Sequence, residues 1–211
     1  PVLAAELRAA LDDTGRGVSI VGAAAPVGPG KTVTFGITTS EPSFSLVSMI
    51  ICTNDGFGGL DTRSFPTGEG RTRDYSIQAY DAGTEMNTEL RADVVPAPFC
   101  GDGPGSGESD PDLAENSVIG RHRTLRGVGD LDPALDWQGP VGHLSITKLV
   151  APKTFTVTVE NITTGQWLTP PNFAAHDADL SVWLRGEVAS PGVQAVAENG
   201  DVPVLAAEVA A

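Results

Sequence analysis

The chain has 211 residues, 40% of them apolar, and it carries 13 Lys and Arg against 27 Asp and Glu, which gives a formal net charge of −14. This excess of negative charge argues against nucleic-acid binding and against adsorption to anionic lipid, because both need clustered Lys and Arg. The length is sufficient for one large β-rich domain or two small ones. Since no stretch approaches ~18 consecutive apolar residues, we expect no membrane span.

The predicted elements are mostly short strands separated by turns. Leu3, Leu7 and Leu11 have helical spacing and predict a first helix over residues 3–12. Strands are predicted at 31–38, 44–52, 73–80, 141–150 and 154–161. Irregular loops are predicted at 53–62, 100–116 and 167–179. Short helices are predicted at 193–198 and after Asp201. Many strands, few helices and frequent turns predict an all-β antiparallel sandwich with one or two short helices.

The two cysteines, Cys52 and Cys100, have no spacing that would indicate a zinc site. Cys100 lies in a turn-rich stretch, PAPFCGDGPGSG, where a cross-link would be useful. In a secreted chain we therefore predict a Cys52–Cys100 disulfide. The alternative is a pair of free thiols in a reducing compartment.

Two acidic loops, NDGFGGLD and YDAGTE, are candidates for a cation site. Each follows a strand-like run, so each is expected at a rim of the sandwich. If both lie at the same rim, Asp55, Asp81 and Glu85 can converge, and convergent carboxylates repel unless a cation neutralises them. Calcium suits such a site because it takes six to eight oxygen ligands, and the glycine of YDAGTE would permit the tight turn. The alternative interpretation is that these are solvated turn residues.

No motif identifies an enzyme. No Ser, Cys or Thr has a His and Asp partner at recognisable spacing, and neither GxSxG nor a phosphate-binding glycine loop is present. Two or three carboxylates could serve a hydrolase, but no general base or nucleophile is recognisable. His176 is predicted to be a hydrogen-bonded structural residue rather than a metal ligand.

Three segments together resemble the spondin domain, which is found in the amino-terminal half of F-spondin and in many bacterial secreted proteins. They are YDAGTE, NDGFGGLD and WLRGEVASPGVQAVAENGD, and the resemblance spans nearly the whole chain. It implies a C2-like antiparallel β-sandwich with calcium at one rim, and Asp55, Asp81 and Glu85 match the acidic positions of the calcium loops. This chain departs from the pattern at Glu85, where vertebrate members have Asp, and at Gly56, where Trp usually follows the Asp.

The resemblance implies a secreted or cell-surface protein that binds calcium and acts as a structural or adhesive unit, not as an enzyme. A monomeric calcium-dependent module that binds a glycan or a surface is the alternative, and a hydrolase is less favoured. The expected partners are further copies of the chain and, beyond those, extracellular matrix or a glycan. Neither a nucleic acid nor a membrane span is expected.

The hexapeptide PVLAAE occurs twice, at residues 1–6 and 203–208. The resemblance implies that residues 1–150 form the major part of the domain. It also implies that residues 154–211 are the family's leading strand and helix, which complete the same or a neighbouring domain. Three explanations stay open: an excerpt from a tandem array with a period of about 202 residues, a circular permutation, or cleavage inside the helix. We favour the array or a head-to-tail assembly, which would form filaments.

Overall fold

The computed structural model describes residues 8–11, 17–22, 25–96, 98–102, 105 and 109–209. Its strands, in chain order, are β1 (Arg8–Leu11), β2 (Gly17–Gly22), β3 (Thr32–Thr38), β4 (Ser43–Met49), β5 (Gly56–Ser64), β6 (Thr72–Asp81), β7 (Gly120–Arg121), β8 (Gly142–Lys148), β9 (Thr154–Asn161) and β10 (Asn172–His176). Its helices are α1 (Pro191–Asn199) and α2 (Val202–Val209), and short 3-10 turns lie at Arg91–Asp93, Pro111–Leu113 and Pro133–Leu135.

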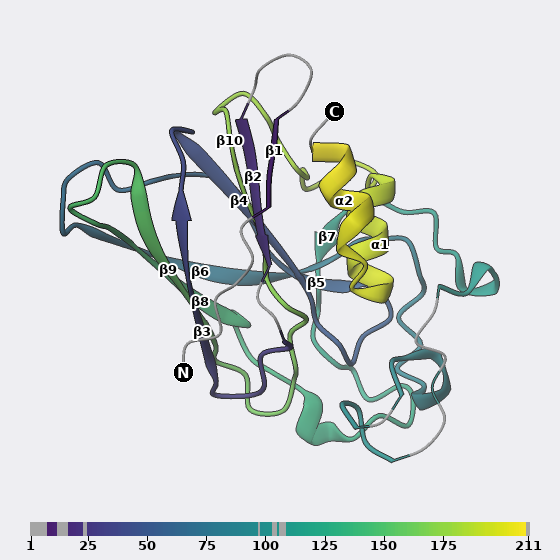
Figure 1. Cartoon of the computed structure of the whole chain (residues 1–211). Coiled ribbons are helices and arrows are strands. Elements are labelled where there is room, and N and C mark those ends of the chain that lie inside the picture. The colour runs from purple at the N-terminus through teal and green to yellow at the C-terminus, as the bar shows by residue number, and fades with distance from the viewer. Residues whose placement is uncertain are drawn as a thin grey trace.

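All the described strand pairs are antiparallel. The order along the sheet is β1-β2-β10-β4-β5-β6-β8-β9-β3, and β7 pairs with β6. The sheet is curled, so that its two halves face each other as the layers of a sandwich (Figure 1). The prediction of an all-β sandwich-like fold with two short helices is therefore confirmed for the described part of the chain.

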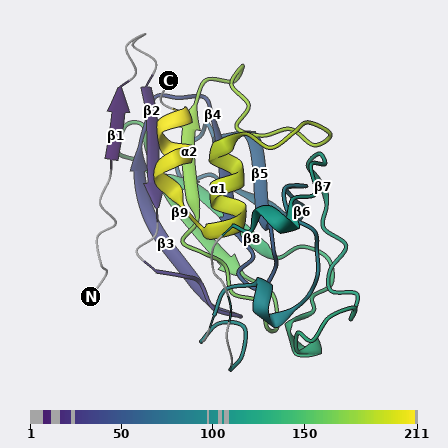
Figure 2. The ribbon, with the colours of Figure 1, turned by 90° about the vertical axis from the view of Figure 1, so that its right-hand side faces the viewer.

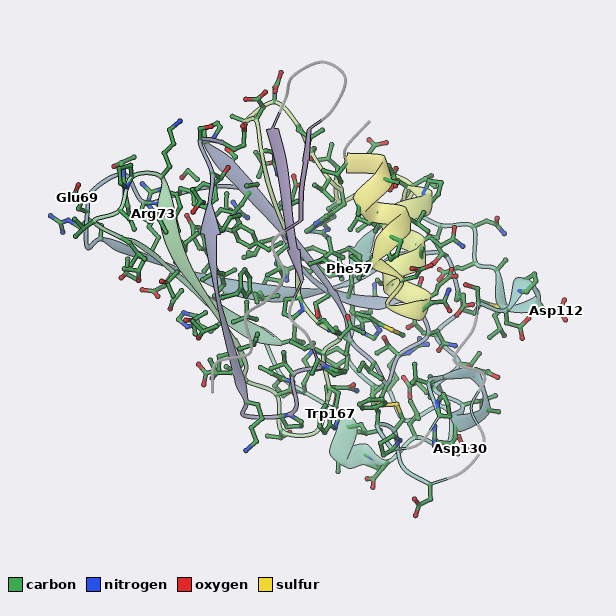
Figure 3. All side chains as sticks on the ribbon, viewed as in Figure 1. Phe57, Glu69, Arg73, Asp112, Asp130 and Trp167 are labelled. Carbon is green, nitrogen blue, oxygen red and sulfur yellow. A yellow bond between two sulfur atoms is a disulfide. The ribbon has the colours of Figure 1, made fainter. Side chains whose placement is uncertain are left out.

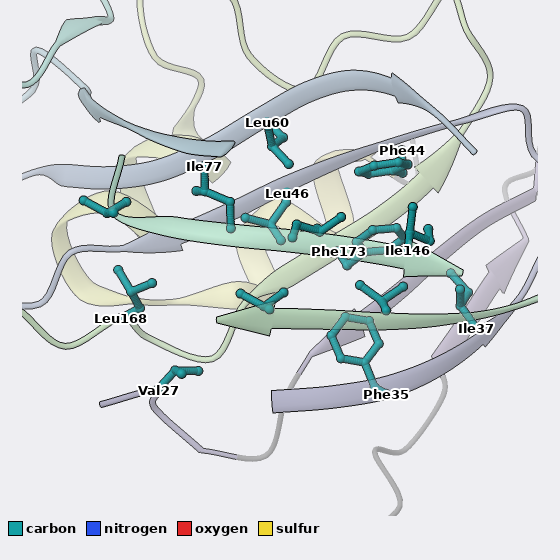
Figure 4. Close-up of a cluster of buried hydrophobic side chains, with 14 of the residues drawn as sticks. Val27, Phe35, Ile37, Phe44, Leu46, Leu60, Ile77, Ile146, Leu168 and Phe173 are labelled. Carbon is teal, nitrogen blue, oxygen red and sulfur yellow. The ribbon is translucent and has the colours of Figure 1, made fainter. Parts of the chain in front are cut away.

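The main core lies between the two layers (Figure 4). Strand β9 shows why strands could be predicted from alternating apolar residues. Phe155, Val157 and Val159 are buried, while the threonines between them are partly exposed. Phe44 stacks on Phe173 with ring centroids 4.8 Å apart, which joins β4 to β10. Burial of these side chains supplies the main driving force for closing the sheet on itself.

The two helices cover the outer face of the β4–β5 part of the sheet (Figure 2). Val193 and Val196 of α1 and Leu205 of α2 belong to one buried cluster with Phe57, which is labelled beside the helices in Figure 3. Ser190 caps α1, because its hydroxyl accepts a hydrogen bond from the amide of Val193 (3.3 Å). Within the described residues, no helix is both long enough and apolar enough to cross a membrane.

The second copy of PVLAAE lies in α2 and is tied to α1. The Glu208 carboxylate accepts hydrogen bonds from the Gly192 amide (2.7 Å) and the Ser190 hydroxyl (3.0 Å) at the start of α1. A Cβ atom at Gly192 would lie 2.7 Å from the Leu205 Cα, so only glycine allows the helices to approach this closely. The first copy, residues 1–6, lies outside the described residues.

Strand β9 pairs with β8 of the same chain, with Lys148 opposite Phe155, and also with β3. The connector between β8 and β9 closes a hairpin, since the Leu149 amide donates to the Thr154 carbonyl (2.9 Å). The segment after Lys153 therefore completes the sandwich of its own chain here.

Three sequence expectations are corrected. Residues 8–11 form β1 rather than a helix, because their backbone pairs with β2. The loop expected over 53–62 is β5 from Gly56 onward, and the loop expected over 167–179 contains β10. In β5, a Cβ at Gly59 would lie 2.7 Å from the Trp183 ring, so this glycine, which suggested a loop, leaves room for an aromatic side chain.

The predicted disulfide joins Cys52 to Cys100, with the two Cα atoms 5.4 Å apart (Figure 3). It lies in a small separate core with Ile51, Val94 and Leu135. The bond holds the long segment after β6 against the turn that leads into β5.

We expect removal of this disulfide to destabilise the protein strongly. The cysteines are 48 residues apart, and the loop-entropy relation then gives about 4 kcal/mol for the double variant Cys52→Ala/Cys100→Ala. Urea unfolding of the variant and of the oxidised protein measures the difference. A loss below about 1 kcal/mol would contradict this role for the bond.

Candidate metal centre

The candidate centre is built around Asp55, in the turn between β4 and β5. The side chain is wholly buried. Its Oδ2 accepts hydrogen bonds from the amides of Thr84 (2.7 Å) and Glu85 (3.0 Å) and from the Thr84 hydroxyl (3.2 Å). Its Oδ1 is also buried but has no hydrogen-bond partner. One oxygen thus fastens the loop after β6, and the other is left with unused acceptor capacity.

The turn around Asp55 is closed by Thr53. Its hydroxyl donates to the Ile50 carbonyl (2.7 Å) and accepts from the Gly56 amide (2.9 Å). A Cβ at Gly56 would lie 2.4 Å from that hydroxyl oxygen. This contact explains why a glycine follows Asp55 in this chain.

Asp81 ends β6 and is paired with Gly56 at the start of β5. Its Oδ1 accepts from the Gly83 amide (2.9 Å) and its Oδ2 from the Asn87 side chain (2.7 Å). Gly83 has φ 70°, and a Cβ there would lie 2.8 Å from the Val118 carbonyl oxygen. The tight turn expected at this glycine is therefore present.

Glu85 is buried beside Asp55, but its carboxylate has a partner of its own. Its Oε1 accepts a hydrogen bond from the Asp110 amide (2.7 Å). The 81–85 loop also pairs with the later acidic stretch, through a bridge between Glu85 and Ala114. That pairing brings Glu115 close enough to Asp81 for their charges to interact. The sequence interpretation did not include Glu115 among the candidates.

The carboxylates of the centre are electrostatically uncompensated. Burial, together with the neighbouring Asp81 charge, raises the pKa of Asp55 from 3.8 to about 7. Burial also raises the pKa of Glu85 from 4.5 to about 7, and the charges of Glu198 and Asp55 add to it. Burial and the Asp81 charge raise the pKa of Glu115 as well. The ion pair found among the described residues, Arg126–Glu89 at 3.9 Å, involves none of these groups.

The three predicted ligands are therefore only partly assembled. The structure brings Asp55 and Asp81 together, and it places the Glu85 backbone on Asp55. In the described part of the chain, however, no group of three or more His, Cys, Asp or Glu side chains is arranged so that it could hold a metal ion. The hydrogen bond from the Asp110 amide involves Oε1 of Glu85 and leaves Oε2 without a hydrogen-bond partner among the described residues. The oxygen donors themselves are of the kind that calcium prefers.

His176 has the structural role that was predicted. The ring is buried, with Nδ1 2.7 Å from the Asp177 carbonyl oxygen and Nε2 2.8 Å from the Ser45 hydroxyl. Both ring nitrogens are thus used inside the fold.

The raised pKa values predict how stability depends on pH in metal-free protein. An acid whose pKa is higher in the folded state holds its proton more tightly there. The stabilisation is complete below the unfolded values near 4 and is lost as pH rises through about 7. In EDTA we expect the melting temperature to fall between about pH 5 and about pH 7.5.

The variant Asp55→Asn keeps an oxygen acceptor but cannot ionise, so its melting temperature should fall less over this range. Asp179→Asn, at an exposed position, is the matched control and should follow the wild type. Scanning calorimetry at several pH values makes the comparison. Parallel pH profiles for Asp55→Asn and wild type would show that Asp55 does not carry the effect.

Comparisons with known proteins place this chain in no family. No family model matches the sequence, and no curated protein or solved structure matches it. The resemblance to spondin domains therefore stays a prediction that rests on the motifs quoted above.

Proposed function

We propose that the chain is a calcium-binding β-sandwich that acts as a structural or adhesive unit outside the cell. The observation that carries the proposal is the buried Oδ1 of Asp55, which has no hydrogen-bond partner, on a carboxylate that also interacts with the Asp81 charge. A buried carboxylate oxygen in this situation needs a proton or a cation. A bound calcium ion would be that cation, so no Lys or Arg side chain would be needed beside Asp55.

A calcium ion at this rim would connect two segments that are far apart in the sequence. Asp55 belongs to the turn before β5, and Asp81 ends β6. Burial is the main cause of the raised pKa of Asp55, and the Asp81 charge adds to it; a cation beside both carboxylates would offset both causes. The role of the ion would then be mechanical, because it would lock the 81–85 loop onto the sandwich.

The proposed location outside the cell is supported by the disulfide. Disulfides persist in oxidising compartments and are rare in the cytosol. Calcium at extracellular concentrations suits even a weak site, since extracellular modules bind it with Kd of about 10⁻⁴ to 10⁻³ M. The proposed role is non-enzymatic.

Calcium should raise the melting temperature if it binds the folded state alone. At a hundredfold excess over Kd the stabilisation is about 2.7 kcal/mol. We expect calorimetry to show a higher melting temperature in calcium than in EDTA for the wild type and for the control Asp179→Asn. Asp81→Asn should reduce the difference. An equal melting temperature in calcium and in EDTA for the wild type would contradict the proposal.

We also propose that copies of the chain associate through the repeated hexapeptide. Strand β9 completes its own sandwich, so exchange of this strand between chains is not needed. The groove for this hexapeptide is occupied by Leu205 of the chain's own second PVLAAE. The same six residues of another molecule would therefore bind there by displacing α2, as an exchange of this helix between chains. A head-to-tail contact of this kind does not close on itself and produces filaments.

Leu3 and Leu205 occupy the same position in the two copies and provide a matched pair of variants. If the first copy docks on another molecule, Leu3→Asp should abolish assembly without unfolding the chain. Leu205→Asp should instead destabilise the fold, because Leu205 is buried. Light scattering and urea unfolding separate the two effects. A wild-type mass of 21.8 kDa at every concentration tested would rule out the assembly.

A second candidate function, a calcium-dependent module that binds a glycan, is favoured by one observation. A cleft of about 720 Å³ lies beside the candidate metal centre, and Asp81 is part of its lining. The volume lies within the range of about 300–1,000 Å³ that is typical of small-ligand sites.

A further inference from the structure

The cleft beside Asp81 contains charges of both signs. Two carboxylates, Asp81 and Glu115, contribute to its lining, as do three arginines, Arg121, Arg123 and Arg126. The three arginines fall within six residues of a chain that has 13 Lys and Arg and a net charge of −14. The local cluster of positive charge contrasts with the negative net charge of the whole chain.

The three arginines differ in how far they are already bound. Arg121 donates to the Gln78 side chain (2.7 Å) and lies over the Tyr80 ring. Arg126 lies 3.9 Å from a carboxylate oxygen of Glu89. Arg123 is exposed, and its guanidinium makes no hydrogen bond or ion pair with the described residues. Arg123 is thus the cation of the cleft that is available to a ligand.

The backbone that carries these arginines is held in place from both ends. Strand β7 pairs with β6, with Arg121 opposite Tyr80. Further along, the buried Glu89 carboxylate accepts hydrogen bonds from the amides of Arg126 (2.5 Å) and Val128 (3.0 Å). The segment between these anchors is therefore preorganised, which lowers the entropic cost of binding a ligand.

The acidic part of the cleft is held by a chain of hydrogen bonds. The Asn87 amide group donates to Asp81 (2.7 Å), so its carbonyl oxygen faces the Nε2 of His122 (3.1 Å). His122 in turn packs against the Trp137 ring. Asp81 is thus fixed at its place in the cleft, and among the described residues it forms no ion pair with Arg123.

We propose that this cleft binds a small ligand with an oxyanion group, a carboxylate, a sulfate or a phosphate, and that Arg123 is the main contact. A guanidinium offers paired N–H donors that match the geometry of such groups. Arg126 adds a second positive charge, while Asp81 and Glu115 disfavour ligands with negative charge spread over their whole length. An acidic sugar, with one charged group and neutral hydroxyls, fits this distribution. The proposal does not require calcium at Asp81.

Titration calorimetry of the whole chain with four probes tests the proposal: glucuronate, glucose 6-sulfate, inorganic phosphate and neutral glucose. We expect at least one of the three oxyanion probes to bind and glucose not to bind. The identity of the probe that binds distinguishes a carboxylate, a sulfate and a phosphate source. Arg123→Gln should weaken binding about tenfold or more, as expected for loss of a charge-assisted hydrogen bond. Arg185→Gln, at an exposed position away from the cleft lining, should have no effect.

Each titration is run in calcium and in EDTA. Binding in EDTA that depends on Arg123 supports the proposal even if calcium has no effect, and it separates this inference from the calcium proposal. Failure of all three oxyanion probes in both conditions would overturn it. Equal affinities for Arg123→Gln and Arg185→Gln would also overturn it, since they would mark the binding as non-specific.

Discussion

The buried carboxylate of Asp55 is the constraint on which the rim of this sandwich depends. One oxygen takes three hydrogen bonds from Thr84 and Glu85, and it thereby fixes the loop after β6 against the turn before β5. The other oxygen has no partner although it is buried. Leaving an ionised carboxylate in this state is costly, so the group must hold a proton or face a cation. Both the calcium proposal and the pH dependence follow from this single arrangement.

The position of Asp55 is itself a result of packing around β5. Phe57 packs edge-on against Trp183 with ring centroids 5.2 Å apart, and Gly59 leaves space for the same tryptophan. Asp61 at the far part of β5 accepts hydrogen bonds from the Val182 amide (2.9 Å) and from Ser45 (3.1 Å). These contacts hold β5 beneath the helices. They thereby also fix the position of the turn that contains Asp55, because this turn leads directly into β5.

Part of the sheet could be predicted because β3, β8 and β9 alternate between buried and more exposed residues. The pattern is clear in β9, where Phe155 and Val157 point into the core. Strand β10 was missed because all of Asn172–His176 is buried and shows no alternation. Strand β5 was missed because its glycines are needed by neighbours from distant segments, which a local pattern does not show. Gly58 is needed by Val141 and Ile77, and Gly59 by Trp183. The helix predicted over residues 3–12 fails at Arg8–Leu11, where pairing with β2 prevails over helix propensity.

The site was predictable to the extent that its residues lie in short motifs. Asp55, Asp81 and Glu85 stand in two acidic loops, and the structure does place these loops side by side. The bond from Glu85 to the Asp110 amide and the approach of Glu115 could not be predicted, because the bridge between Glu85 and Ala114 creates them. The arginine cleft depends in the same way on the pairing of β7 with β6. Residues that meet through pairing of distant segments leave no local signal in the sequence.

We propose that the unpaired oxygen of Asp55 faces a calcium ion in the functional protein. Native mass spectrometry after dialysis against calcium tests it most directly, with the chain and its Asp55→Asn variant measured side by side. The account predicts one calcium ion per wild-type chain and none on the variant. A wild-type chain without calcium, or a variant that holds as much calcium as the wild type, would contradict it.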